Sequence, residues 1–211
     1  MERGSVSEMQ EDQEIVSSIV SDPSLLDKVA EALSGASRRA RQHAAAIMHG
    51  VAAEKPELLL PYDDALIDAL NRPEARTRWE CLDALTILVD IDSRSCDKAI
   101  PDAEGSLFDE ESGPVRLAAL RFLCKIGATT ENRSEKTWPL IDEALQCYHG
   151  DLEFGDMLVA VVDYSRGKLS DRVKSELGAR VSFDAANSKG SLQRRSQQIL
   201  ENVSAPSAKQ E

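Results

Sequence analysis

The sequence predicts an all-α protein built from repeated helical hairpins. Apolar residues recur with a helical period along most of the 211 residues, and no stretch alternates between apolar and polar residues long enough to predict a strand. Aromatic residues make up only 4% of the chain, and a composition dominated by alanine and leucine favours helices packed closely on helices. The third observation is an internal repeat, which is typical of stacked helical units.

Proline marks the first helix of each predicted repeat. Four prolines are spaced by 38, 40 and 38 residues, and a short amphipathic stretch follows each of them: Pro23, Pro61, Pro101 and Pro139. Proline is tolerated in the first turn of a helix, where its missing N–H would lack a partner. We therefore expect four equivalent helix starts, with polar loops at Asn132–Lys136 and Ala185–Gly190.

Arginine marks the second helix of the first three repeats. Arg41, Arg78 and Arg116 lie 37 and 38 residues apart, and apolar residues follow each at offsets of three, seven and ten. These offsets share one helical face, which predicts a buried stripe. The stripe comprises Ala44, Met48 and Val51, then Cys81, Leu85 and Leu88, then Ala119, Leu123 and Ile126. The same period reaches Phe154 and Gln193, so two degraded repeats complete a set of five.

This pattern resembles the HEAT repeat of the armadillo-type α-solenoids, most closely at Val115–Leu120. Over 21–203 the resemblance implies a short α-solenoid of about five HEAT-like hairpins. The units lie near 21–55, 56–95, 96–133, 134–167 and 168–203, in one domain over 11–203 with an N-terminal capping helix at 11–20. Residues 1–10 and 204–211 are expected to be disordered tails.

The sequence departs from the HEAT pattern before the arginines. The family usually carries an aspartate in the turn, about six residues before the arginine. Gly35 and Arg72 occupy that place in the first two units, and Glu110, beside Asp109, in the third. The ordered Asp–Arg ladder of the family therefore lacks its usual acid in units one and two.

The charge of the chain is concentrated in its N-terminal half. Residues 1–110 contain 11 Lys and Arg against 23 Asp and Glu, whereas residues 111–211 contain 14 of each. Such an acidic field repels nucleic-acid backbones and anionic lipids. The basic stretch at 164–200 is expected to give the last repeat a polar outer surface. With no signal-like segment and no apolar run of about 18 residues, a cytoplasmic location is expected.

The reactive side chains show no catalytic or metal-binding pattern. Cys81, Cys96, Cys124 and Cys147 are separated by 15, 28 and 23 residues, which matches no zinc spacing with the three histidines, so four buried free thiols are expected. The sequence also contains no glycine-rich phosphate loop, nucleophile elbow or zincin motif. We expect no metal and no cofactor, and nothing in the sequence supports catalysis.

The solvent-facing positions of the second helices are the expected partner-binding surface, because a solenoid presents these helices as a row on its concave side. The expected row contains His43, Trp79, Glu80, Asp83, Arg121 and Lys125. Trp79 borders the buried stripe, where its indole either meets a ligand or fills a gap between repeats. Arg41, Arg78 and Arg116 are expected to bond to neighbouring turns rather than to form an anion-binding row.

These features predict a noncatalytic interaction or scaffold module that binds a protein or peptide, with the acidic half favouring a basic partner. The resemblance leaves two alternatives. One is a nucleic-acid-binding protein similar to HEAT-like DNA alkylation-repair enzymes, which the net charge of −12 and the few aromatic residues oppose. The other is a phycobilin-lyase-like HEAT protein, for which the sequence holds no dedicated motif.

Overall fold

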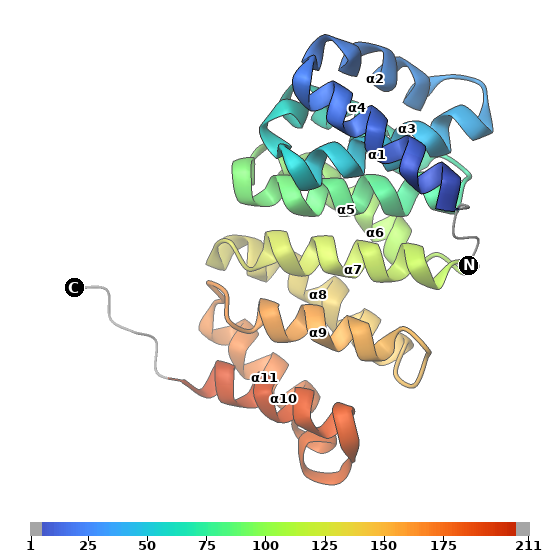
Figure 1. Cartoon of the computed structure of the whole chain (residues 1–211). Helices are drawn as coiled ribbons and strands as arrows, with labels where there is room; N and C mark the ends of the chain where they lie inside the picture. Colours follow the sequence, from blue (N-terminus) through green and yellow to red (C-terminus); the bar gives the residue numbers. More distant parts are fainter. Residues whose placement is uncertain (1–5, 206–211) are drawn as a thin grey trace. The chain divides into compact units, whose positions relative to one another are not determined.

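The structure, a computed structural model, describes residues 6–205, with side chains from residue 12 onward (Figure 1). All regular structure in this part of the chain is helical. The chain forms two compact units, Met1–Phe122 and Leu123–Glu211.

The α-helices are α1 (Val6–Ser21), α2 (Leu26–Ser34), α3 (Arg38–Glu54), α4 (Asp63–Asp68), α5 (Ala75–Asp92), α6 (Ile100–Leu107), α7 (Gly113–Gly127), α8 (Glu131–Cys147), α9 (Phe154–Tyr164), α10 (Asp171–Asn187) and α11 (Gly190–Ser204).

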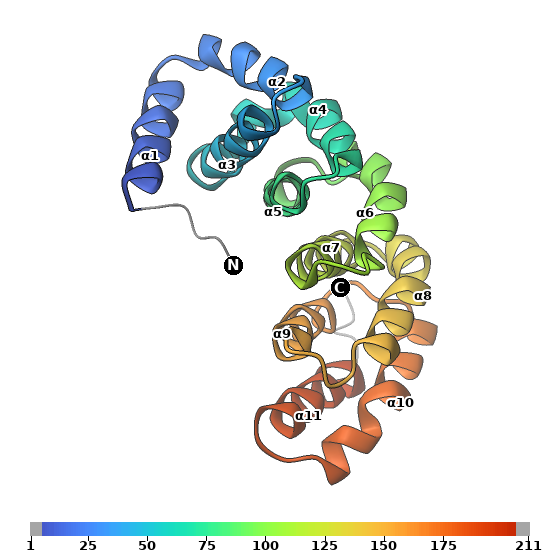
Figure 2. The same cartoon turned by 90° about the vertical axis from the view of Figure 1, so that its right-hand side faces the viewer.

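The N-terminal unit has two layers of helices. The second helices α3 and α5 lie side by side in one layer, and α2, α4 and α6 form the other (Figure 2). Short 3₁₀ segments, Pro23–Leu25, Pro56–Tyr62, Ala69–Asn71 and Ser95–Ala99, lead into or follow the outer helices. Helix α1 packs on α3 through the buried Val16 and Ile19. Gly50 permits this approach, because a Cβ at Gly50 would lie 2.7 Å from a methyl group of Val16.

The predicted apolar stripe forms the core of both units. All nine residues at offsets of three, seven and ten are buried, and Leu85 and Leu123 are both fully inaccessible. Burial of these side chains removes apolar surface from water at roughly 25 cal/mol per Å², which is the main force that holds one hairpin to the next. The prediction of the helical faces from periodicity is therefore confirmed.

Three of the four prolines lie close to the start of a first helix, and the fourth does not. Pro23 begins a 3₁₀ turn, Pro61 lies two residues before α4, and Pro101 is the second residue of α6. Pro139 is inside α8, so the expected helix start is wrong there. The expected loop at 132–136 is wrong for the same reason, because the Thr130 side chain caps α8 by accepting a hydrogen bond from the Arg133 N–H.

The ends of the chain differ slightly from the prediction. Helix α1 starts at Val6, so residues 6–10 are helical and do not belong to a disordered tail. The sequence explains this, since no glycine or proline interrupts the chain between Ser5 and Pro23. At the other end α11 continues to Ser204. The outermost parts of the expected tails, 1–5 and 206–211, lie outside the described residues.

An arginine ladder joins neighbouring repeats in the N-terminal unit, with acids at other positions than the family pattern uses. Arg41 binds the carboxylate of Glu74, and Arg78 Nη1 lies 2.7 Å from Asp109 Oδ2. Glu74 stands four residues before its repeat's arginine, so the six-residue spacing of the family does not predict it, whereas Asp109, seven residues before Arg116, is the acid noted beside Glu110. The pKa of the Glu74 carboxyl is lowered, chiefly by its bond to Arg41.

The C-terminal unit contains the hairpins α8–α9 and α10–α11. Ser170 caps α10 by accepting a hydrogen bond from the Val173 N–H, and the Ser134 hydroxyl accepts one from the Ser170 N–H at 3.1 Å. The loop expected at 185–190 shrinks to two residues, because α10 extends to Asn187 and α11 begins at Gly190. Gly190 has a φ of 67°, which glycine adopts without steric cost.

Candidate partner-binding site

The predicted row residues come from three second helices. His43 lies on α3, Trp79, Glu80 and Asp83 lie on α5, and Arg121 and Lys125 lie on α7. Arg121 is exposed, and the other five side chains are partly accessible. Lys125 lies in the part of α7 that belongs to the C-terminal unit, whereas the other five residues belong to the N-terminal unit.

Helix α1 contacts the part of the row that α3 was expected to provide. His43 Nε2 lies 2.7 Å from Asp12 Oδ1 of α1, and Val16 of the same helix rests on Gly50. The imidazole of His43 is therefore engaged within the chain, although its side chain is 42% exposed.

A polar network that the sequence analysis missed joins α3 to α5. His49 Nδ1 lies 2.7 Å from Glu80 Oε2, and Arg76 Nε lies 3.5 Å from the other oxygen of Glu80. The bond to Glu80 raises the pKa of His49 against the opposing effect of burial. Burial raises the pKa of the Glu80 carboxyl, but the hydrogen bonds and charges of His49 and Arg76 together outweigh it, so that this pKa lies below its usual range. Glu80 is thus an occupied acceptor.

Asp83 differs from Glu80 in its hydrogen bonding. It is half-buried three residues after Glu80, and no described residue donates a hydrogen bond to its carboxylate. Burial raises the pKa of Asp83, while the charges of His49 and Arg121 oppose the rise. A partly desolvated carboxylate without a direct donor is a ready acceptor for a cation.

Trp79 precedes Asp83 by four residues on α5, which places the two side chains one above the other on the same helix face. The indole is partly exposed, and no residue among those described accepts a hydrogen bond from its N–H. An aromatic face next to a carboxylate can hold a guanidinium or ammonium group by a cation–π contact together with an ion pair.

The arginines of the repeat motif make structural contacts. Beyond its bond to Glu74, Arg41 Nη1 donates to the carbonyls of Gly35 and Ala36 at 2.8 and 3.0 Å. Arg116 Nη1 donates to the Asp109 carbonyl at 2.9 Å. These bonds to neighbouring turns agree with the expectation from the sequence and leave no support for an anion-binding row.

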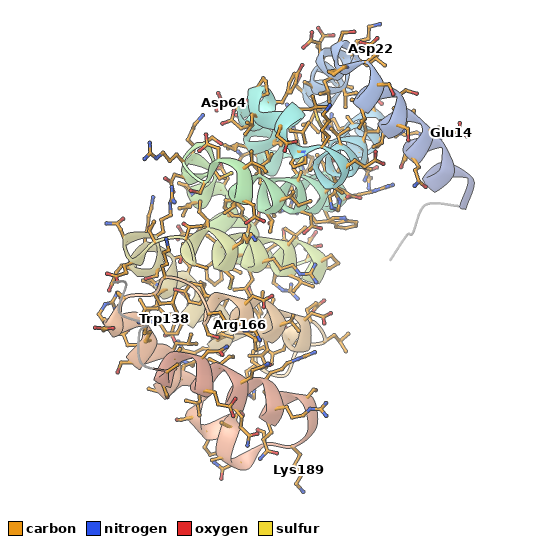
Figure 3. The ribbon with its side chains drawn as sticks, turned by 60° about the vertical axis from the view of Figure 1, so that its left-hand side comes forward. Glu14, Asp22, Asp64, Trp138, Arg166 and Lys189 are labelled. Carbon is orange, nitrogen blue, oxygen red and sulfur yellow. The ribbon has the colours of Figure 1, made fainter. Side chains whose placement is uncertain are left out.

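The basic residues of the C-terminal unit are largely paired. Arg172 binds Glu135 and Glu176, and Arg180 donates to both oxygens of Asp142 at 2.6 and 3.0 Å. Lys189 points away from the fold at the turn between α10 and α11 (Figure 3). The final repeat was expected to have a polar outer surface, but Phe183 of α10 is an apolar side chain that is 72% exposed.

Three of the four cysteines are buried as expected, and the fourth is not. Burial raises the pKa of the thiols of Cys81, Cys96 and Cys124, to about 11 for Cys96. Cys147 is exposed, because it is the last residue of α8 and lies off the buried face of that helix. Among the described side chains, no group of three or more His, Cys, Asp or Glu could hold a metal ion. No helix between residues 6 and 205 combines the length and apolar character needed to cross a membrane.

Comparison with known proteins identifies the fold. The sequence matches no protein-family model, and a search of curated proteins found no match either. Solved structures do match. A designed armadillo repeat protein in complex with the peptide (KR)4 is 14% identical, with 90% of this chain and 86% of that chain covered and a TM-score of 0.73. Computationally designed armadillo repeat proteins for modular peptide recognition are 15% identical, covering 93% and 90% of the two chains, with a TM-score of 0.74.

A third designed armadillo repeat protein is 16% identical over 90% of this chain and 87% of its own, with a TM-score of 0.72. Identities this low support a likeness of fold alone, since one fold carries many functions. The helical content, the repeated hairpins and these matches agree with one another, and the protein has an all-α solenoid fold of the HEAT and armadillo type.

Proposed function

We propose that the protein is a noncatalytic binding module that holds a basic peptide segment on the exposed face of α5, next to the α7 residue Arg121. The observation that carries this proposal is the pairing of Trp79 with Asp83, an aromatic side chain and a half-buried carboxylate four residues apart on one helix face. A lysine or arginine side chain of the partner would lie on the indole and end at the carboxylate.

The charge of the N-terminal unit supports a basic partner. Residues 1–122 contain 13 Lys and Arg against 24 Asp and Glu. A field of this sign raises the rate at which cationic segments arrive, and the partly buried Asp83 supplies the short-range contact that a solvated surface carboxylate would not. The designed armadillo protein solved with (KR)4 binds a peptide of alternating lysine and arginine, which makes that peptide a suitable first probe.

The test is the binding of a fluorescein-labelled (KR)4 peptide, measured by fluorescence anisotropy at constant ionic strength. We expect Asp83→Asn to weaken binding by about tenfold, equivalent to about 1.4 kcal/mol, because the substitution removes the charge and keeps the size of the side chain. Trp79→Ala should produce a loss of similar size through the missing cation–π face.

The matched control is Asp68→Asn. Asp68 is an exposed carboxylate on α4, in the other layer of the same unit, so this variant removes the same charge from the same acidic field. It should retain the wild-type affinity within about twofold, since long-range steering is screened beyond about 8 Å at physiological salt. Equal losses in D83N and D68N would show that the peptide binds the general field, and the proposed site would then be wrong.

A further inference from the structure

We propose that His49 makes this site pH-sensitive, releasing a bound basic peptide when the imidazole gains a proton. The proposal rests on the proposed function, because it concerns the regulation of the same surface. It begins from a juxtaposition in the N-terminal unit. The imidazole of His49 on α3 bonds to Glu80 of α5 and interacts electrostatically with Asp83 of the same helix.

The position of His49 suits a proton sensor. Its side chain is 35% exposed, so protons exchange with solvent, yet its Nδ1 lies 2.7 Å from Glu80 Oε2. The imidazole also interacts electrostatically with Asp83, the carboxylate that has no hydrogen-bond donor among the described residues. A charge gained at His49 therefore acts on both acids of the site.

The local charge count gives the sign of the effect. With neutral His49, the two carboxylates Glu80 and Asp83 balance the two guanidinium groups of Arg76 and Arg121. Protonated His49 adds one positive charge. The site thus changes from balanced to positive as pH falls, which repels a cationic peptide.

The surroundings of the imidazole confirm which groups take part. On α5, Glu80 and Asp83 raise the pKa of His49, and burial lowers it, with the bond to Glu80 the largest effect. On α1, the side chain beside the neighbouring Gly50 is the apolar Val16, and the acid Asp12 bonds to His43 instead. Helix α2 lies in the other layer (Figure 2), where its Asp27 accepts a hydrogen bond from the Tyr62 hydroxyl. Because the pKa of His49 is raised, the change falls above the usual histidine value of about 6.5.

The experiment measures the affinity of labelled (KR)4 at about pH 8 and about pH 6, an interval that spans histidine titration, at constant ionic strength. The wild-type protein should bind at least about fivefold more weakly at the lower pH, as expected for one added charge near the ligand. In His49→Gln the ratio of the two affinities should fall to about one to two, whatever the absolute affinity of the variant.

The other two histidines are matched controls. His43 and His149 each lie within 3.0 Å of an aspartate oxygen, as His49 does of a glutamate oxygen, but His49 is the histidine whose charge acts on Asp83. H43Q and H149Q should therefore keep the wild-type ratio. Glu80→Gln gives a second test that retains the imidazole. By removing the bond that raises the pKa of His49, it should move the histidine titration seen by NMR to lower pH.

The outcomes separate the two proposals. Absence of (KR)4 binding at pH 8 overturns the proposed function, and the pH switch is overturned with it. Binding at pH 8 with an affinity that does not change by pH 6 overturns the switch alone. So does a pH dependence that persists in H49Q or disappears equally in H43Q.

Discussion

The two tryptophans show how differently the two units use the same repeat. Trp138 of α8, labelled in Figure 3, is buried and donates a hydrogen bond from its indole to Glu176 at 2.6 Å. Trp79 of α5 is partly exposed, and its indole has no acceptor among the described residues. A buried, satisfied indole holds two helices together, whereas an open indole is available to a partner. Trp138 therefore makes a structural contact within its unit, whereas Trp79 is the aromatic side chain of the proposed site.

The balance of acidic and basic residues also differs between the two units. In the C-terminal unit, 12 Lys and Arg face 13 Asp and Glu, and the arginines Arg172 and Arg180 of α10 bond to acids of α8. In the N-terminal unit acids exceed bases by 24 to 13, so carboxylates such as Asp83 stay without a basic partner in direct contact. Buried apolar stripes therefore build both units, which differ in the balance of their charged side chains.

The largest expected effect tests what the two units share. Leu85 and Leu123 occupy the same offset in neighbouring repeats, and both are fully buried. Replacing either with alanine should lower the free energy of unfolding by about 2–5 kcal/mol, from lost transfer energy and the cavity that remains. Urea denaturation followed by circular dichroism measures the loss.

Arg121→Ala is the control for the leucine substitutions. Arg121 is exposed on the helix that carries Leu123, and its loss should cost less than about 0.5 kcal/mol. If L123A and R121A were equally destabilising, the helical face assigned from the repeat would be rotated. If only L85A were destabilising, the two units would not share one construction.

An intermediate effect should separate the two tryptophans. Trp138→Phe removes the indole donor from Glu176 and leaves a gap, so it should destabilise the protein by about 1–3 kcal/mol. Trp79→Phe removes no hydrogen bond to a described residue and should cost less than about 0.5 kcal/mol. Thermal or urea unfolding of the two variants makes the comparison. A larger loss for W79F would mean that Trp79 fills a gap between repeats, and the proposed site would lose its aromatic surface.

The sequence predicted the stripe well because apolar periodicity is a local property that each helix repeats. It failed at Pro139, where capping by Thr130 starts the helix eight residues earlier and proline is tolerated in the interior. Part of the candidate site was also predictable. Trp79, Glu80 and Asp83 follow from the helix face, but the bond between His49 and Glu80 joins residues 31 apart, and no local pattern marks it.

The arginine ladder and the contact of α1 with His43 could not be predicted for the same reason, because both join residues that are far apart in the sequence. In the ladder, an acid at any position whose carboxylate can contact the guanidinium forms the ion pair. Glu74 and Asp109 therefore bind their arginines from different positions in the turn. The sequence predicts the capping helix from its apolar residues. It does not predict the bond between His43 and Asp12, because that bond depends on how α1 lies on α3. Contacts between repeats require the spacing of packed helices, which a single sequence does not supply.

The smallest expected effect concerns nucleic acid, for which the basic residues of the C-terminal unit are the remaining support. Phosphate binding needs several cations that share one face and are not neutralised by neighbouring acids. Arg172 and Arg180 are held by acids of α8, and Arg195 donates to the carbonyl of Gly155 on α9. Arg194 is exposed, but the acidic N-terminal unit is part of the same chain.

We therefore expect no DNA or RNA affinity tighter than the roughly 10⁻⁴–10⁻⁶ M of nonspecific contacts, and no change in that affinity on Arg194→Glu with Arg195→Glu. Anisotropy with labelled duplex and single-stranded oligonucleotides would measure both. A submicromolar affinity that falls steeply with salt and disappears in the double variant would instead make the C-terminal unit the binding region, and the division between the two units would be reversed.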